Sequence, residues 1–116
     1  MTAKSIVDET FENRKQESER VKGKYVNRIP IIILKDKRST MADIDKNKFL
    51  VPKDMTITQF MYIVRKRINI KPEEALFVLV NGGLINGNKL MGDIYEIKKN
   101  DDGFLYMTYT SENTFG

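Results

Sequence analysis

The sequence predicts an α+β protein with a mixed four-stranded sheet that is covered by helices on both faces. Two stretches, 28–35 and 46–52, carry apolar side chains on both faces of a predicted strand, which indicates a sheet buried on two sides. An amphipathic helix is predicted after Thr56, and further strand patterns follow it. The chain has 116 residues, which suits one domain with one hydrophobic core.

The composition argues against several classes of protein. The chain has no cysteine and no histidine, so it lacks the commonest general base and metal ligand, and we expect no triad or zinc enzyme, no metal and no cofactor. No apolar run approaches membrane-spanning length, and the first residues lack the apolar core of a signal peptide. The net charge of +4 lies in the first half, where it could attract an acidic peptide, an anionic membrane or nucleic acid.

The N-terminal region is expected to form a cover over the second face of the sheet. Residues 2–9 are predicted to form a short helix or to stay irregular. Thr10 is a plausible N-cap for a helix from Phe11 to about Lys24. The apolar stripe of this helix is thin and is interrupted by Ser18; it comprises Phe11, Val21 and then Tyr25.

Two strands follow. In the strand 28–35, Pro30 must lie near the start or face a gap in the hydrogen-bond ladder. A polar loop anchored by Ile44 leads to the stretch 46–52, which has the lysines and the proline typical of a sheet edge. Alternation places Lys48 and Leu50 on one face of this strand, and Phe49 and Val51 on the other. Such a strand can be enclosed in a core, or it can accept an incoming peptide strand.

The remaining elements are predicted from capping and periodicity. Thr56 and Gln59 form a capping box for the main helix, which should end before Pro72. Residues 75–80 are a buried strand, 90–97 a short helix and 104–110 a strand. The apolar face of the main helix comprises Ile57, Phe60, Met61, Val64 and Ile68.

Several ordered segments show a resemblance to a known family. They are Phe11-Glu12-Asn13-Arg14, Glu17-Ser18-Glu19-Arg20, Asn27-Arg28-Ile29-Pro30, Lys48-Phe49-Leu50-Val51-Pro52, Gln59-Phe60, Ile63-Val64-Arg65-Lys66-Arg67, Gly103-Phe104-Leu105-Tyr106 and Glu112-Asn113-Thr114-Phe115-Gly116. The chain resembles the autophagy ubiquitin-like modifiers of the GABARAP type. The resemblance implies a ubiquitin-like β-grasp core at 28–110, an N-terminal extension at 1–27 with two additional helices packed on the sheet, and a flexible tail at 111–116.

The resemblance also implies a binding edge for peptides of the form aromatic-x-x-aliphatic, with acidic flanks, from autophagy receptors and adaptors. One pocket lies between the N-terminal helices and the sheet and comprises Glu17, Val21, Pro30, Ile32, Lys48, Leu50 and Phe104. A second lies between the strand and the main helix and comprises Phe49, Val51, Pro52, Met55, Phe60 and Ile63. Arg28, Lys46 and Arg67 are expected to attract the acidic flanks.

The family is joined through a C-terminal glycine to phosphatidylethanolamine, and the matching residue here is Gly116. The resemblance therefore implies activating and conjugating enzymes and a processing cysteine protease as partners, with Phe115, Phe77 and Leu79 as enzyme contacts. It implies a cytoplasmic protein that lies on autophagosomal and vacuole- or lysosome-related membranes when lipidated, and a substrate of enzymes instead of an enzyme.

Two alternatives remain open. An unconjugated ubiquitin-like scaffold domain would bind peptides without using Gly116. A nucleic-acid-binding α+β domain is disfavoured because the aromatic signature of RNA-binding sheets is missing, so no nucleic acid is expected.

Overall fold

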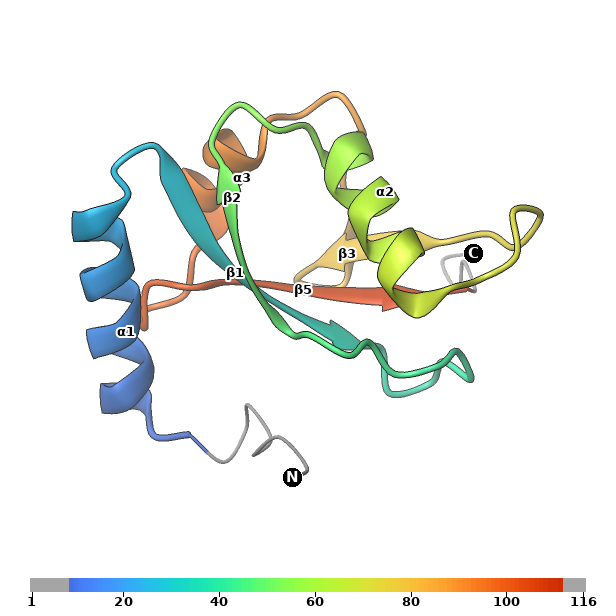
Figure 1. Ribbon diagram of the computed structural model, residues 1–116, viewed down its shortest axis with the longest axis horizontal. Coiled ribbons are helices and arrows are strands. Elements are labelled where there is room, and N and C mark those ends of the chain that lie inside the picture. The colour runs from blue at the N-terminus through green and yellow to red at the C-terminus, as the bar shows by residue number, and fades with distance from the viewer. Residues whose placement is uncertain (1–8, 112–116) are drawn as a thin grey trace.

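Three helices and five strands lie within residues 9–111, the part of the chain that the computed structural model describes (Figure 1). In chain order they are α1 (Phe11–Lys24), β1 (Arg28–Lys35), β2 (Lys48–Pro52), α2 (Ile57–Ile68), β3 (Phe77–Val80), β4 (Gly83–Leu84), α3 (Met91–Lys98) and β5 (Leu105–Thr110). None of these helices is long and apolar enough to cross a membrane.

The strands form one mixed sheet in the order β2-β1-β5-β3-β4. The neighbouring strands β1 and β5 run parallel, and every other neighbouring pair is antiparallel. The α+β class and the mixed sheet are confirmed, whereas the expected number of four strands is wrong by one.

The missed strand, β4, is the short second arm of a hairpin. Asn81 and Gly82 have φ angles of 52° and 77°, so both central residues of the turn are in the left-handed region, as tight hairpins require. The turn reverses the chain at once and pairs Val80 with Gly83. Two residues with a single apolar side chain carry no alternation, which is why the sequence showed only a turn here.

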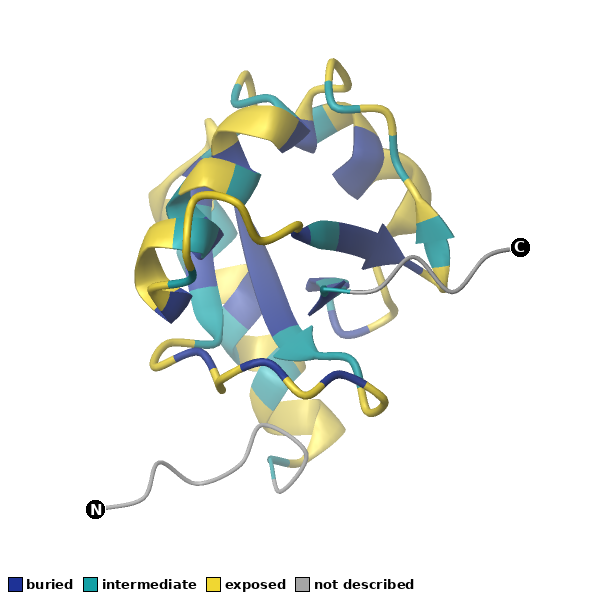
Figure 2. Cartoon of the chain, turned by 90° about the vertical axis from the view of Figure 1, so that its right-hand side faces the viewer, coloured by how far each residue is buried: buried dark blue, intermediate teal, exposed yellow. Residues whose placement is uncertain are grey.

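The hydrophobic core lies between the sheet and α2, and it appears as the dark-blue interior of Figure 2. The predicted capping box is confirmed, because Gln59 N–H donates to Thr56 Oγ1 and Thr56 N–H donates to Gln59 Oε1. Alternate residues of β1 and β2 meet the buried face of α2. The core members of these elements are Ile29, Ile31, Ile33, Phe49, Val51, Ile57, Phe60, Val64 and Ile68.

Helix α1 packs against β1 on the face of the sheet opposite α2 (Figure 1). Thr10 caps it as predicted and accepts a hydrogen bond from Asn13 N–H at 3.1 Å. The predicted apolar stripe is wrong, however, because Phe11 is 46% exposed and Tyr25 is 41% exposed. The buried residue of α1 is Ser18, so this helix is fixed largely by polar contacts.

The other boundaries differ from the prediction by small amounts. The strand expected at 75–80 begins only at Phe77, and Ala75 is exposed. Ile44 is buried, as its predicted role of loop anchor requires. The further N-terminal helix and the tail beyond Ser111 fall on residues 1–8 and 112–116, outside the described residues.

Candidate functional site

The outer edge of β2 presents backbone groups that no described strand pairs. Within residues 9–111, β2 is the terminal strand of the sheet and its only strand partner is β1. Ile33 N–H donates to Asn47 C=O at 2.8 Å, and Lys53 N–H donates to Asn27 C=O at 3.0 Å. In an antiparallel pair these positions alternate, so Lys48 and Leu50 direct their N–H and C=O groups away from β1. The edge can therefore hydrogen-bond an added strand at these two residues.

A pocket of about 170 Å³ lies beside this edge, between α1 and the sheet. It is lined by Glu17, Val21, Pro30, Lys46, Lys48, Phe49, Leu50 and Phe104. These include six of the seven residues expected for the first pocket. The seventh, Ile32, is fully buried and pairs with Lys48 across the sheet. The predicted face of Lys48 and Leu50 is thus the face that meets α1.

Lys48 closes one side of this pocket through two ion pairs. Its Nζ lies 2.6 Å from Glu17 Oε1 and 2.7 Å from Glu9 Oε1. Burial alone lowers the pKa of the Lys48 ammonium, but the hydrogen bonds to Glu17 and Glu9 outweigh it and leave this pKa above its ordinary value. The same Nζ lies 5.8 Å from the centre of the Phe104 ring. Lys48 therefore joins β2 to α1 across the pocket.

The residues expected to form the second pocket separate into a floor and a surface. Phe49 and Phe60 are buried and meet edge to face, with ring centres 5.6 Å apart, and Val51 is buried beside them in the same core. The half-buried members of the set, which form its surface, are Pro52, Met55 and Ile63. Pro52 alternates with Val51 along the strand and lines a separate hollow with Arg28.

Two of the expected rim cations lie against the ring of Phe49. Lys46 Nζ is 5.0 Å from the ring centre, and the Arg67 guanidinium carbon is 5.9 Å from it. Arg67 is also paired in a fork with Asp45, at 3.0 and 3.3 Å. Arg28 is exposed and lines a different surface hollow, next to Pro52. The three cations are therefore not equivalent, because Arg67 already holds a carboxylate.

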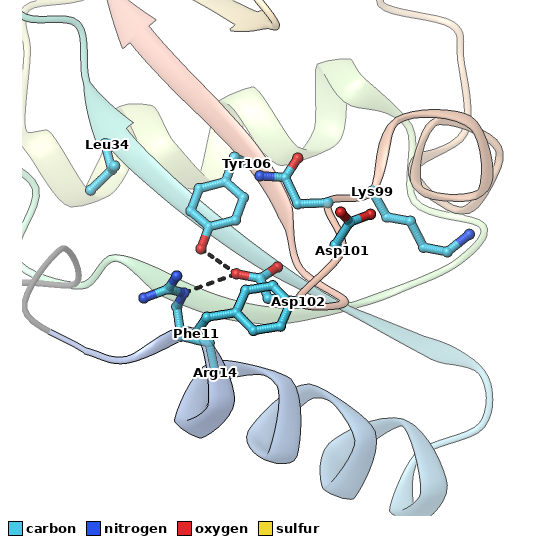
Figure 3. Close-up of a pocket in the computed structure, with 8 residues that line it drawn as sticks. Phe11, Arg14, Leu34, Lys99, Asp101, Asp102 and Tyr106 are labelled. Carbon is cyan, nitrogen blue, oxygen red and sulfur yellow. Dashed lines mark hydrogen bonds and ion pairs between the residues drawn. The ribbon is translucent and has the colours of Figure 1, made fainter.

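Sequence reasoning missed the buried carboxylate of Asp102. It accepts hydrogen bonds from Arg14 Nε at 2.9 Å and from the Tyr106 hydroxyl at 2.5 Å (Figure 3). Burial and this hydrogen bond raise the pKa of Tyr106. Asp102 belongs to the segment 100–103, whose sequence indicates an exposed turn and gives no sign of a buried carboxylate. The sequence feature that could have indicated this contact is Ser18, a small polar residue that interrupts the predicted apolar stripe of α1 and contacts the backbone of Asp102.

The residues expected to contact processing and conjugation enzymes differ in their exposure to solvent. Leu79 is 2% exposed and pairs with Thr108 and Leu84 inside the sheet, so the expected surface role is not compatible with this position. Phe77 is half-buried at the start of β3 and stays a candidate. Phe115 and Gly116 lie outside the described residues.

Comparison with known proteins identifies the class of this fold. The family model described as autophagy protein Atg8 ubiquitin like matches residues 13–116. Autophagy-related protein 8B of Oryza sativa is 53% identical over 110 residues, which cover 95% of this chain and 92% of the relative. Autophagy-related protein 8 of Coccidioides immitis is 51% identical over 116 residues, which cover 100% of this chain and 99% of the relative.

Solved structures agree with the sequence relatives. Trypanosoma brucei ATG8 matches with a TM-score of 0.89 at 40% identity and covers 100% of both chains. Plasmodium falciparum Atg8, solved in complex with a Plasmodium falciparum Atg3 peptide, matches with a TM-score of 0.86 at 37% identity and covers 97% of this chain and 99% of that one. The fold is thus that of a ubiquitin-like protein. The chain belongs to the Atg8 family of autophagy ubiquitin-like modifiers.

Proposed function

We propose that this protein binds short extended peptides at the edge of β2 and is itself joined to phosphatidylethanolamine through Gly116. The observation that carries the first part is the pocket between α1 and the sheet, which opens beside the outward-directed backbone of Lys48 and Leu50. An added strand would gain main-chain hydrogen bonds there, while alternate side chains would enter the pockets above and below.

The chemistry of the pocket suits a peptide of the form aromatic-x-x-aliphatic with acidic flanks. The first pocket combines the apolar walls Val21, Leu50 and Phe104 with a cationic rim at Lys46 and Lys48. An aromatic side chain fits such a small, mostly apolar hollow, and the rim attracts carboxylates. A smaller aliphatic side chain suits the half-buried surface of Met55 and Ile63.

The complex of the Plasmodium falciparum relative with an Atg3 peptide supports peptide binding by this fold. Receptors and adaptors of autophagy are the partners that the family resemblance implies. The proposed cellular place is the cytoplasm, with autophagosomal and vacuole- or lysosome-related membranes after lipidation.

Titration calorimetry tests the binding part. A peptide with both anchors and acidic flanks should bind, and a matched peptide with alanine at both anchors should not. Equal affinity for the two peptides would reject the pocket assignment.

Conjugation is proposed to begin at the Gly116 carboxylate, which an activating enzyme adenylates with ATP, releasing pyrophosphate. A cysteine thiolate then displaces AMP to form a thioester, and the lipid amine displaces the cysteine thiolate to form the amide. Glycine suits this step because, without a Cβ, the terminal residues can pass through a narrow enzyme channel. Phe115 is the one large apolar side chain in the last six residues, so it is the proposed enzyme contact. A cysteine protease for processing or delipidation completes the partners.

A reconstituted reaction with purified conjugation enzymes and phosphatidylethanolamine liposomes tests this second part. Gly116→Ala should abolish or severely slow lipid transfer while it leaves the melting temperature and peptide affinity unchanged. If the alanine variant is lipidated normally, the modifier function is wrong and the unconjugated peptide-binding scaffold remains.

A further inference from the structure

Helix α1 makes a buried contact with the turn that precedes β5. Ser18 is fully buried there, and its hydroxyl donates to the Asp102 C=O at 2.5 Å. Gly103 has a φ of +87°, and a Cβ at this position would lie 2.2 Å from Ser18 Oγ. The absence of a side chain at Gly103 therefore allows Ser18 of the helix to pack directly against the turn.

The side chain of Asp102 fixes the same contact from a second direction. This carboxylate is 3% exposed, and its Oδ2 accepts from Arg14 Nε on α1 and from the Tyr106 hydroxyl on β5. Its Oδ1 accepts from Phe104 N–H at 3.0 Å. Figure 3 shows Arg14 and Tyr106 converging on Asp102 from the helix and from the sheet. A buried carboxylate with three donors holds its partners strongly, because leaving any of them unpaired is costly.

Two opposite walls of the peptide pocket are connected to this one carboxylate. Glu17 and Val21 belong to the wall formed by α1, and they lie one residue before and three residues after Ser18. Phe104 belongs to the wall formed by the sheet, and its backbone N–H is held by Asp102. Asp102 itself does not line this pocket.

A second link, between the sheet and the N-terminal region that includes α1, is less suited to set the width of the pocket. It consists of the ion pairs of Lys48 with Glu9 and Glu17, whose side chains are between 25% and 32% exposed. Partly exposed ion pairs contribute little and exchange partners readily, and an acidic peptide flank would compete for the same ammonium. The buried contact at Asp102 is free of this competition.

We infer, on the basis of the function proposed above, that Asp102 is a positioning residue for the aromatic anchor of the peptide. It sets the distance between α1 and Phe104, and thereby the fit of the first pocket, without touching the peptide. The second anchor, next to α2, does not depend on it.

The test compares anchor discrimination in variants of the full chain. Three acid-flanked peptides are titrated: one with both anchors, one with alanine for the aromatic residue and one with alanine for the aliphatic residue. The isosteric change Asp102→Asn removes the charge that holds Arg14. The matched control is Asp101→Asn, at the exposed neighbouring residue. Arg14→Gln breaks the same bond from the helix and serves if the first variant does not fold.

In Asp102→Asn and Arg14→Gln, the preference for the aromatic residue over alanine should fall by about tenfold, the size expected for one lost charged hydrogen bond. In the same two variants, the preference for the aliphatic residue over alanine should stay as in the wild type. In the control Asp101→Asn, the aromatic and the aliphatic preference should both stay as in the wild type. A variant that lowers the melting temperature but keeps the aromatic preference would overturn the inference, since Asp102 would then only stabilise the fold. A wild type without aromatic preference would overturn the proposed function of the pocket as well.

Discussion

Lys48 on β2 and Glu17 on α1 form an ion pair of 2.6 Å across the first pocket, and Glu9 joins the same ammonium at 2.7 Å. The protein therefore already supplies carboxylates to the cation that an acidic peptide flank would approach. A peptide bound as proposed would therefore compete for Lys48 with Glu17 on α1 and with Glu9, which precedes the helix.

Glu9→Gln should strengthen the binding of acid-flanked peptides. The change removes one competing carboxylate from Lys48, and a partly exposed ion pair is worth at most about 1 kcal/mol, so the gain should be up to about fivefold. Calorimetry at low salt measures it. Glu12→Gln, in the exposed first turn of α1, is the matched control. A gain that is equally large for a peptide with neutral flanks would show that competition for Lys48 is not the cause.

Leu50→Ala should weaken the peptide by about 2 kcal/mol, as a central apolar contact of an interface would. Leu50 is half-buried on the pocket side of β2, so the truncation also removes some packing. A melting curve of the free variant separates the two effects. Leu84→Ala, on the short strand at the other edge of the sheet, should leave the affinity unchanged. Equal affinities for Leu50→Ala and wild type would remove Leu50 from the site.

Charge reversal at the rim should slow association, and the two candidate residues should differ. Lys46→Glu is expected to have the larger effect, because Arg67 is already paired in a fork with Asp45. Stopped-flow rates with an acid-flanked peptide measure this, and the slowing should shrink at high salt. If Lys46→Glu associates at the wild-type rate in low salt, the rim cations have no part in recruitment.

Two glycines should respond in opposite directions to alanine. Gly103→Ala should destabilise the fold by roughly 2 kcal/mol or more, because its φ is +87° and the added Cβ would collide with Ser18. Gly23 lies in α1 with no atom near its Cβ position, so Gly23→Ala should stabilise by about 0.5–1 kcal/mol. Denaturant unfolding of both variants checks the pair. A Gly103→Ala protein as stable as the wild type would mean that α1 is not held at this turn.

The elements with a strong local signal could be predicted from the sequence. The capping box at Thr56 and the periodic face of α2 follow from rules that act within a few residues, and both are confirmed. The alternation in β2 likewise placed Lys48 and Leu50 on one face and the buried Phe49 and Val51 on the other. These predictions succeeded because burial and chain geometry act at short range there.

The contacts that fix α1 could not be predicted in the same way. Ser18 and Asp102 are 84 residues apart in the chain, and neither has a side chain that indicates burial. A thin apolar stripe suggested that Phe11 and Tyr25 hold the helix, whereas a buried carboxylate and a hydroxyl do so. The enzyme-contact role of Leu79 came from the resemblance alone, whereas the strand pattern at 75–80 already indicated a buried position, which Leu79 has.

Amide hydrogen exchange along β2 tests the central claim most directly, which is that a peptide adds to this edge as a strand. The pairing with β1 leaves the amides of Lys48 and Leu50 directed outward, and those of Phe49 and Val51 bonded inward. Saturation with an acid-flanked aromatic-x-x-aliphatic peptide should protect the amide of Lys48, Leu50 or both from exchange, while the already protected amides of Phe49 and Val51 change little. Unchanged exchange at both Lys48 and Leu50 in the saturated complex would contradict the account.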